Sequence, residues 1–364
     1  MCVKLTTFVS DGKSYRKENG RAPQKRSTPE MHAEGVSMQN FLLYCVLPLN
    51  YRMRFRFLSK KDVRQFLANT GCASYSARMK RIGVIVNPKR ARAENTLEQL
   101  HAAAVRHGWE LVCDQPEMAA RLSASSVKVS SFANEVDLVL ALGGDGTVLY
   151  AAHALMGSPV PVLGINLGRL GFLTAIAEDE LAQALDQVAL GDYELHKREG
   201  ALATWHSVNG QTEQWPALND VVIGWGGSSR ISKLELEVDQ EPVGQFSCDG
   251  IIISTATGST GHALSNGGPI MHPEIHGFGI SVICPHTLGS RPMVVPNRSR
   301  IEVALVRCHK ELLLSVDGQD CRTVQQGDRL IIERYAVPLQ MVQLPGHSYF
   351  HTLAQKLNWQ GSVV

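Results

Sequence analysis

Apolar residues become regularly spaced near residue 80 of this 364-residue chain. A short apolar run stopped by Asn87-Pro88 predicts a buried strand, and the next segment has helical spacing that ends at Gly108. The alternation then continues, with strands expected at 82–86, 109–113, 136–142 and 160–166 and helices at 94–108 and 148–156. Strands that alternate with helices predict a parallel sheet covered by helices.

The pattern changes near residue 200, where period-two alternation such as 233–238 replaces helical spacing. Turn dipeptides such as Asp249-Gly250 and Asp317-Gly318 separate several of the apolar runs. The further strands are expected at 219–225, 250–255, 301–306, 311–316 and 329–333. We therefore expect a Rossmann-like α/β domain at 79–198, a β-sandwich domain at 199–345, and a helical tail at 346–364 that packs back on the first domain.

Residues 1–78 lack sustained periodicity and hold 14 Lys and Arg against 5 Asp and Glu. We expect a basic, disordered and dispensable extension there, with the folded body beginning at Met79. The whole chain carries +2, so residues 79–364 carry −7. An acidic body argues against nucleic-acid binding, which needs a basic face. It also means that a polyphosphate substrate would need local cationic help, such as Mg²⁺.

The eight cysteines show no Cys-x-x-Cys motif and no zinc-finger spacing with histidine. Their pattern fits reduced, mostly buried thiols and a cytoplasmic location. The apolar stretch at 41–49 is nine residues long and contains a proline, so it is too short to span a bilayer. Neither a membrane anchor nor a metal site is expected, because His272-Pro273-Glu274-Ile275-His276 lacks the His-Glu-x-x-His order.

The most informative local motif is Gly143-Gly144-Asp145-Gly146-Thr147, between a predicted buried strand and a helix. The carboxyl edge of a parallel sheet is where ligands bind, and glycines let backbone N–H groups approach a phosphate. The motif lacks the Lys-Ser/Thr of a Walker loop and the Gly-x-Gly-x-x-Gly of a dinucleotide fold.

Asp145 decides what this loop can do, because a carboxylate beside phosphates repels them unless it has a chemical role. It can bind Mg²⁺ or accept the proton of a hydroxyl nucleophile, and both roles indicate phosphoryl transfer. The alternative is a tight turn in which Asp145 only caps the helix.

A second polar block follows the expected strand at 251–253. Residues 254–262 read Ser-Thr-Ala-Thr-Gly-Ser-Thr-Gly-His, and Ser265-Asn266-Gly267-Gly268-Pro269 continues the same character. Such a run offers hydroxyl groups and close backbone approach to a sugar or phosphate. An ordinary polar loop remains the alternative, and serine hydrolysis has no support because Ser259 lacks a Gly-x-Ser-x-Gly elbow.

Together the two blocks resemble the NAD kinase family, bacterial type, over about residues 79–360. The likeness includes 164–174 (Gly-Ile-Asn-Leu-Gly-Arg-Leu-Gly-Phe-Leu-Thr), 218–222, 285–288 with Arg291-Pro292, and 348–350. The resemblance implies transfer of a phosphoryl group from ATP, with Mg²⁺ or another divalent metal, to the 2′-hydroxyl of the adenosine ribose of NAD. It also implies a homodimer or homotetramer built largely through the β domain.

By the same resemblance, Asp145 is the catalytic base. The phosphates are expected at Gly143, Gly144, Gly146 and Thr147. The dinucleotide is expected at Asn219, Asp220, Asp249, Thr257, Ser259, Thr260, Gly261, His262 and Ser265, with Asp249 near the nicotinamide. From the residues alone, Asn219-Asp220 could equally be a turn, and Asp249-Gly250 is an ordinary hairpin dipeptide.

The chain departs from the family pattern at three positions: Asp220 stands where glutamate is common, His262 where tyrosine is usual, and Ala175 where aspartate is usual. These departures leave the nucleotide preference open. Two rival functions also remain. One is a lipid kinase of the diacylglycerol or sphingosine type, which shares the Gly-Gly-Asp-Gly-Thr loop, and the other is a non-catalytic nucleotide-binding regulator.

Overall fold

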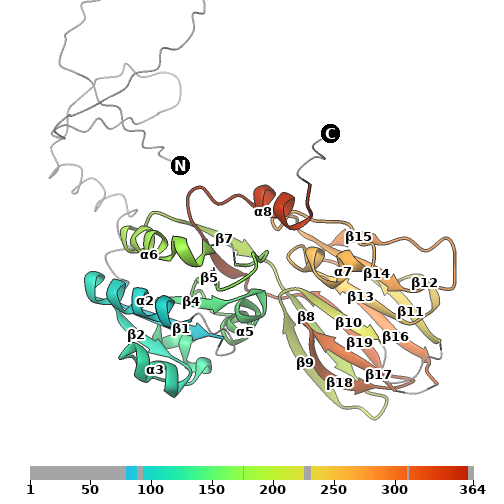
Figure 1. Cartoon of the computed structure of the whole chain (residues 1–364). Coiled ribbons are helices and arrows are strands. Elements are labelled where there is room, and N and C mark those ends of the chain that lie inside the picture. Colours follow the sequence, from blue (N-terminus) through green and yellow to red (C-terminus); the bar gives the residue numbers. More distant parts are fainter. Residues whose placement is uncertain (1–78, 88–92, 175, 225–230, 310, 360–364) are drawn as a thin grey trace, which may run out of the picture. The chain divides into compact units, whose positions relative to one another are not determined.

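The computed structural model of the chain describes residues 79–87, 93–174, 176–224, 231–309 and 311–359 (Figure 1). The basic extension at 1–78 and Ala175 therefore lie outside the described residues. None of the helices in the described ranges has the length and apolar character needed to cross a membrane.

The first half is an α/β layer in which the apolar runs form the central strands of a parallel sheet. Its strands within the described ranges have the order β3-β2-β1-β4-β5-β20-β7, and β6 pairs with β5. They are β1 (Arg81–Val86), β2 (Glu110–Cys113), β3 (Ser125–Ser126), β4 (Leu138–Gly143), β5 (Val162–Asn166), β6 (Ile176–Ala177), β7 (Glu194–Arg198) and β20 (Leu339–Gln343). Only the β20–β7 pair is antiparallel among the pairs described.

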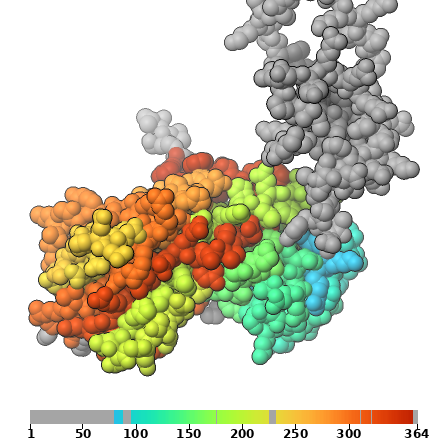
Figure 2. All heavy atoms as spheres, turned by 180° about the vertical axis from the view of Figure 1, so that it is seen from behind, coloured from blue at the N-terminus to red at the C-terminus, as the bar shows by residue number. Residues whose placement is uncertain are grey.

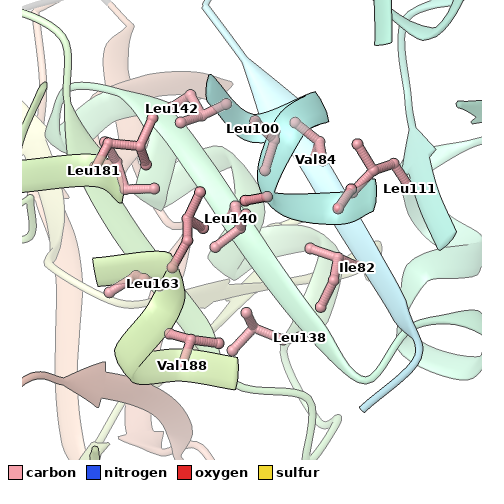
Figure 3. Packing of buried hydrophobic residues seen from close by; sticks show 14 of the residues in the cluster. Ile82, Val84, Leu100, Leu111, Leu138, Leu140, Leu142, Leu163, Leu181 and Val188 are labelled. Carbon is pink, nitrogen blue, oxygen red and sulfur yellow. The ribbon is translucent and has the colours of Figure 1, made fainter. Parts of the chain in front are cut away.

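Helices cover both faces of this sheet because its strands are apolar on both sides. The helices are α2 (Ala93–His107), α3 (Pro116–Leu122), α4 (Phe132–Glu135), α5 (Asp145–Leu155) and α6 (Leu181–Leu190). Leu138, Leu140 and Leu142 face α2 and α6 in one cluster (Figure 3), whereas Val139 and Ala141 face α5 in another. The predicted parallel sheet with flanking helices is confirmed.

The second half is a sandwich of two antiparallel sheets. One has the order β15-β14-β13-β10-β17-β18 and the other β12-β11-β16-β19-β8-β9. The first contains β10 (Asp220–Gly224), β13 (Gly250–Ser254), β14 (Gly277–Ile283), β15 (Met293–Pro296), β17 (Leu312–Val316) and β18 (Gln319–Val324). The second contains β8 (Ala201–His206), β9 (Thr212–Ala217), β11 (Ser232–Val238), β12 (Glu241–Cys248), β16 (Ile301–Arg307) and β19 (Arg329–Arg334).

The two sheets bury one shared core. Val221 and Ile251 of the first sheet pack in the same cluster as Leu234 and Ile332 of the second. Within the second sheet, the yellow-green β8–β9 hairpin lies beside the orange-red strand β19 (Figure 2). The predicted β-sandwich is thereby confirmed.

The predicted domain bounds remain a prediction, and the chain returns to the sheet of the first half near its end. Strand β20, expected within the sandwich, pairs with β5 and β7 in the first sheet. The following helix α8 (Tyr349–Lys356) contacts both halves. The Lys356 ammonium lies 5.4 Å from the centroid of the Phe172 ring, and the Tyr349 ring lies edge-on to His272 at 4.9 Å.

Candidate active site

The glycine loop forms a tight turn between β4 and α5. Gly144 precedes the helix in an extended conformation, and its N–H group points to the Thr147 hydroxyl at 3.4 Å. A side chain at Gly143 would collide with Thr147 and would crowd Asn87. The turn therefore needs glycine at 143 for a steric reason, and it leaves Asp145 as the first residue of α5.

The Asp145 carboxylate is bound by a second loop rather than by its own helix. Its two oxygens accept hydrogen bonds from the N–H groups of Phe172 and Leu173, both at 2.9 Å, and from the Thr174 hydroxyl at 3.3 Å. A side chain at Gly171 would strike this carboxylate. The alternative interpretation, in which Asp145 merely caps α5, is wrong because Gly144 occupies the cap position.

A cavity of about 480 Å³ opens beside this turn, at the carboxyl ends of β1 and β4. Its lining consists of Ile85, Val86, Asn87, Gln115, Gly144, Asp145, Gly146, Thr147 and Tyr150. A Cβ at Gly146 would meet nothing within 4 Å, so Gly146 faces open space. The described lining residues include no lysine or arginine, and the backbone N–H groups at the start of α5 are favourable for anionic groups there.

Asp220 begins β10 and lies beside β13 in the sandwich, paired with Ser254. The residue is only 5% exposed. Burial is the main cause that raises the pKa of Asp220 to about 7, the Asp317 carboxylate raises it further, and a hydrogen bond from the His262 N–H opposes the shift. Asp220 is therefore a buried carboxyl group that changes charge near neutral pH.

The backbone of Asn219 is held from the side of the hydroxyl-rich block. The Thr255 N–H donates to the Asn219 carbonyl at 2.8 Å, and the Thr255 hydroxyl donates to the Leu218 carbonyl at 2.6 Å. A side chain at Gly258 would overlap the carbonyl and Cα of Asn219. This close packing explains why small residues follow β13.

Two buried polar atoms in this region have no hydrogen-bond partner among the described residues. They are the Asn219 side-chain oxygen and the Thr257 hydroxyl. An unsatisfied buried polar group costs about 1–3 kcal/mol, and most buried polar atoms in proteins are bonded. Their lack of partners fits a surface that binds a polar ligand.

The other predicted residues separate into three groups. Thr260 and Gly261 belong to the same turn, bonded to Thr257 and Gly258, and His262 and Ser265 are exposed on the short helix α7 (His262–Ser265). The Ser259 hydroxyl is fully buried between Ala256 and Met271, so it serves the turn itself. Asp249 precedes the other end of β13, roughly 17 Å away for a strand of five residues.

The sequence analysis missed Asp317 as a functional residue and assigned it only to a turn. Its side chain is fully buried and accepts hydrogen bonds from the N–H groups of Leu218, Asn219 and Asp220 at 2.7–3.0 Å. His153 of α5 contacts the same carboxylate at 2.7 Å. The only sequence signal was Asp-Gly between two apolar runs, which predicts a hairpin but not these contacts.

Comparisons with known proteins give a consistent result. Residues 82–193 match the family model of the ATP-NAD kinase N-terminal domain, and residues 218–344 match that of the C-terminal domain. The chain is 38% identical over 282 residues to an NAD kinase of Geotalea daltonii, covering 77% of this chain and 99% of that protein. It is 41% identical over 229 residues to one of Gemmatimonas aurantiaca, covering 62% and 78%.

Solved structures have the same fold. The NAD kinase from Archaeoglobus fulgidus in complex with ATP has a TM-score of 0.62 at 25% identity and covers 77% of this chain and 100% of that one. The yeast NADH kinase complexed with NADH has a TM-score of 0.73 at 22% identity, with coverage of 79% and 89%.

Proposed function

The chain belongs to the ATP-NAD kinase family, whose activity is phosphoryl transfer from ATP to NAD, and we propose that its two halves divide this reaction between them. The turn around Asp145 handles the transferred phosphoryl group. The region around Asn219 and Asp220 holds the dinucleotide. The observation that carries this division is the Asp145 carboxylate fixed beside a cavity at the carboxyl edge of the parallel sheet.

Asp145 acts as the general base in this proposal. A ribose hydroxyl is a poor nucleophile at neutral pH, so its proton must be accepted as the bond to phosphorus forms. The N–H groups of Phe172 and Leu173 and the Thr174 hydroxyl fix the carboxylate direction and occupy three of its roughly four lone-pair sites, so the remaining site on Oδ2 can accept a proton. Transfer to the 2′-hydroxyl of the adenosine ribose gives NADP and ADP.

The donor phosphates of ATP are proposed for the cavity lined by Gly144, Gly146 and Thr147. Mg²⁺ typically keeps several waters and uses one or two carboxylates together with substrate phosphates. Among the described lining residues Asp145 is the one carboxylate, and it is assigned to the proton, so the ion would be held mainly by the ATP phosphates and water. When bound, the ion would neutralise charge on the phosphates.

The dinucleotide is proposed to use the unpartnered Asn219 oxygen and Thr257 hydroxyl, with the exposed His262 and Ser265 near its adenosine side. Asp249 precedes the far end of β13 and is proposed to lie toward the nicotinamide end of an extended dinucleotide. A homodimer or homotetramer built through the β domain is proposed from the family resemblance.

The lipid kinase alternative is disfavoured by the family match and by the pocket itself. An acceptor pocket for a lipid would be apolar, whereas the buried atoms without partners here are polar.

The test is to incubate the purified full-length protein with ATP, Mg²⁺ and NAD and to measure NADP by an enzyme-coupled assay. Parallel reactions replace NAD with NADH or with diacylglycerol in mixed micelles, and ATP with polyphosphate. NADP formation supports the proposal. Phosphorylated lipid without NADP would favour the rival kinase, and nucleotide binding without any product would favour a regulator.

A further inference from the structure

A short polar contact joins α5, the helix that begins at Asp145, to the β17–β18 turn beside residues 218–220. His153 lies on α5, and its Nε2 atom is 2.7 Å from a carboxylate oxygen of Asp317 in the β17–β18 turn. The His153 side chain is 24% exposed and the Asp317 side chain is 0% exposed. A partly exposed histidine therefore reaches inward to a fully buried carboxylate.

The Asp317 side chain holds the backbone of the segment that is proposed to bind the dinucleotide. One of its carboxylate oxygens accepts from the N–H groups of Asn219 and Asp220, and the other accepts from Leu218 and contacts His153. The Asp317 N–H in turn donates to the Asp220 carbonyl at 2.9 Å. Four hydrogen bonds with Asp317 thus fix the path of residues 218–220, and a fifth contact, from His153, joins Asp317 to α5.

The same helix fixes the phosphoryl side. Asp145 is its first residue, and His153 follows eight residues later, about 12 Å along the axis. A helix of this length is stiff, so a displacement at His153 displaces Asp145. The distance from Asp145 to the pocket at Asn219 is therefore set in part by the His153–Asp317 contact.

We propose that His153 and Asp317 are positioning residues for phosphoryl transfer, holding the dinucleotide pocket in register with Asp145. This inference rests on the proposed function. Neither residue touches the reacting atoms. The pair acts on geometry, and a misplacement of about 1 Å can lower the rate of an enzyme by about 100-fold.

The chain supplies a matched control in a second pair of the same type. His107 of α2 contacts Asp186 of α6 at 2.8 Å, and its side chain is 21% exposed. This pair joins two helices on the α/β layer and touches none of the residues assigned to the site. Asp186 is 44% exposed and also pairs with Arg106, so His107→Ala measures what the loss of a histidine–aspartate contact costs away from the site.

The experiment compares His153→Ala, His153→Gln and His107→Ala in the full-length enzyme. We expect His153→Ala to lower kcat about tenfold. His153→Gln should restore kcat to within about twofold, because its amide N–H can donate to Asp317. His107→Ala should leave kcat unchanged. Hydrogen exchange should show faster exchange of the amides of residues 218–220 in His153→Ala alone.

Two outcomes would overturn the proposal. One is a kcat for His153→Ala like that of His107→Ala. The other is unchanged amide exchange at 218–220. Failure of the proposed function has a different signature, since wild-type protein would then form no NADP while the exchange experiment would still report on the contact.

Discussion

Asp145 and Asp220 are the same residue type in opposite surroundings. Asp145 is half-buried beside a cavity, and three donors from one loop fix its carboxylate. Asp220 is buried next to a second carboxyl group, Asp317, and its pKa is raised to about 7. The first carboxylate is the one proposed to react, and the second lies where the dinucleotide is proposed to bind; each variant below tests one side of this division.

The largest effect is expected at the reacting carboxylate. Asp145→Asn keeps the size of the side chain and one acceptor for the N–H groups of Phe172 and Leu173, but it cannot take a proton. We expect kcat to fall about 1,000-fold, within the range for loss of a general base. NAD binding, measured by calorimetry, should change little.

A variant that retained more than about a tenth of the wild-type kcat would contradict the base assignment. Gln115→Ala is the control, because Gln115 lines the same cavity and carries no carboxylate. It should affect the apparent affinity for ATP more than the rate of transfer.

The two sides also differ in how far the sequence could predict them. The Gly-Gly-Asp-Gly-Thr turn is continuous in sequence, so its place between β4 and α5 followed from the apolar run and the helix signal. Its partners at Phe172 and Leu173 lie 27 and 28 residues away. They were noticed only as part of a family likeness, because hydrogen bonds from backbone N–H groups leave no mark on residue type.

The dinucleotide side depends on strand register, which no local pattern gives. Asp317 binds backbone groups 97–99 residues away, and only the pairing of β10 with β13 and β17 brings them together. The turn that follows β13 likewise decides the direction of its hydroxyl groups. The Ser259 hydroxyl turns inward to Met271, whereas that of Thr257 has no partner among the residues described.

The second-largest effect is expected where backbone meets backbone on the dinucleotide side. Gly258→Ala would place a methyl group on the Asn219 carbonyl, and the overlap is with backbone atoms rather than with a flexible side chain. We expect a loss of about 3 kcal/mol in the free energy of unfolding and a rise in KM for NAD. Urea unfolding and initial rates measure the two quantities.

Gly289→Ala is the control for Gly258→Ala, because a Cβ at Gly289 meets nothing within 4 Å. It should leave stability and KM close to those of the wild type. An equal KM for NAD in both variants would show that the position of Asn219 does not matter for binding.

A pH-dependent effect is expected at the recognising carboxylate. The pKa of Asp220 rises from 3.8 to about 7 on folding, so the folded state keeps a proton that the unfolded chain releases between these values. Its contribution to stability therefore falls as pH rises through this window. Between pH 5 and pH 8 the free energy of unfolding of the wild type should therefore fall by about 2 kcal/mol more than that of Asp220→Asn, which has no group to titrate at this position.

Asp239→Asn provides the matched control, since a hydrogen bond from the Arg300 N–H lowers the pKa of Asp239. That carboxylate stays ionised at both pH values, so its replacement should change stability equally at pH 5 and pH 8. Urea unfolding of all three proteins makes the measurement. If the difference in free energy of unfolding between wild type and Asp220→Asn is the same at pH 5 and pH 8, Asp220 does not titrate in this range.

The smallest effect is expected within the hydroxyl-rich block, where the Thr257 and Thr255 hydroxyl groups have different surroundings. Thr257→Val removes a buried hydroxyl that has no partner among the described residues, so the unfolding free energy should stay the same or rise slightly. If the hydroxyl binds NAD, KM should rise about fivefold, or about 1 kcal/mol.

Thr255→Val is the matched change, and because that hydroxyl bonds Leu218 and Gly258, it should lower stability. A stabilised Thr257→Val with unchanged KM for NAD would mean that the ligand does not reach this group.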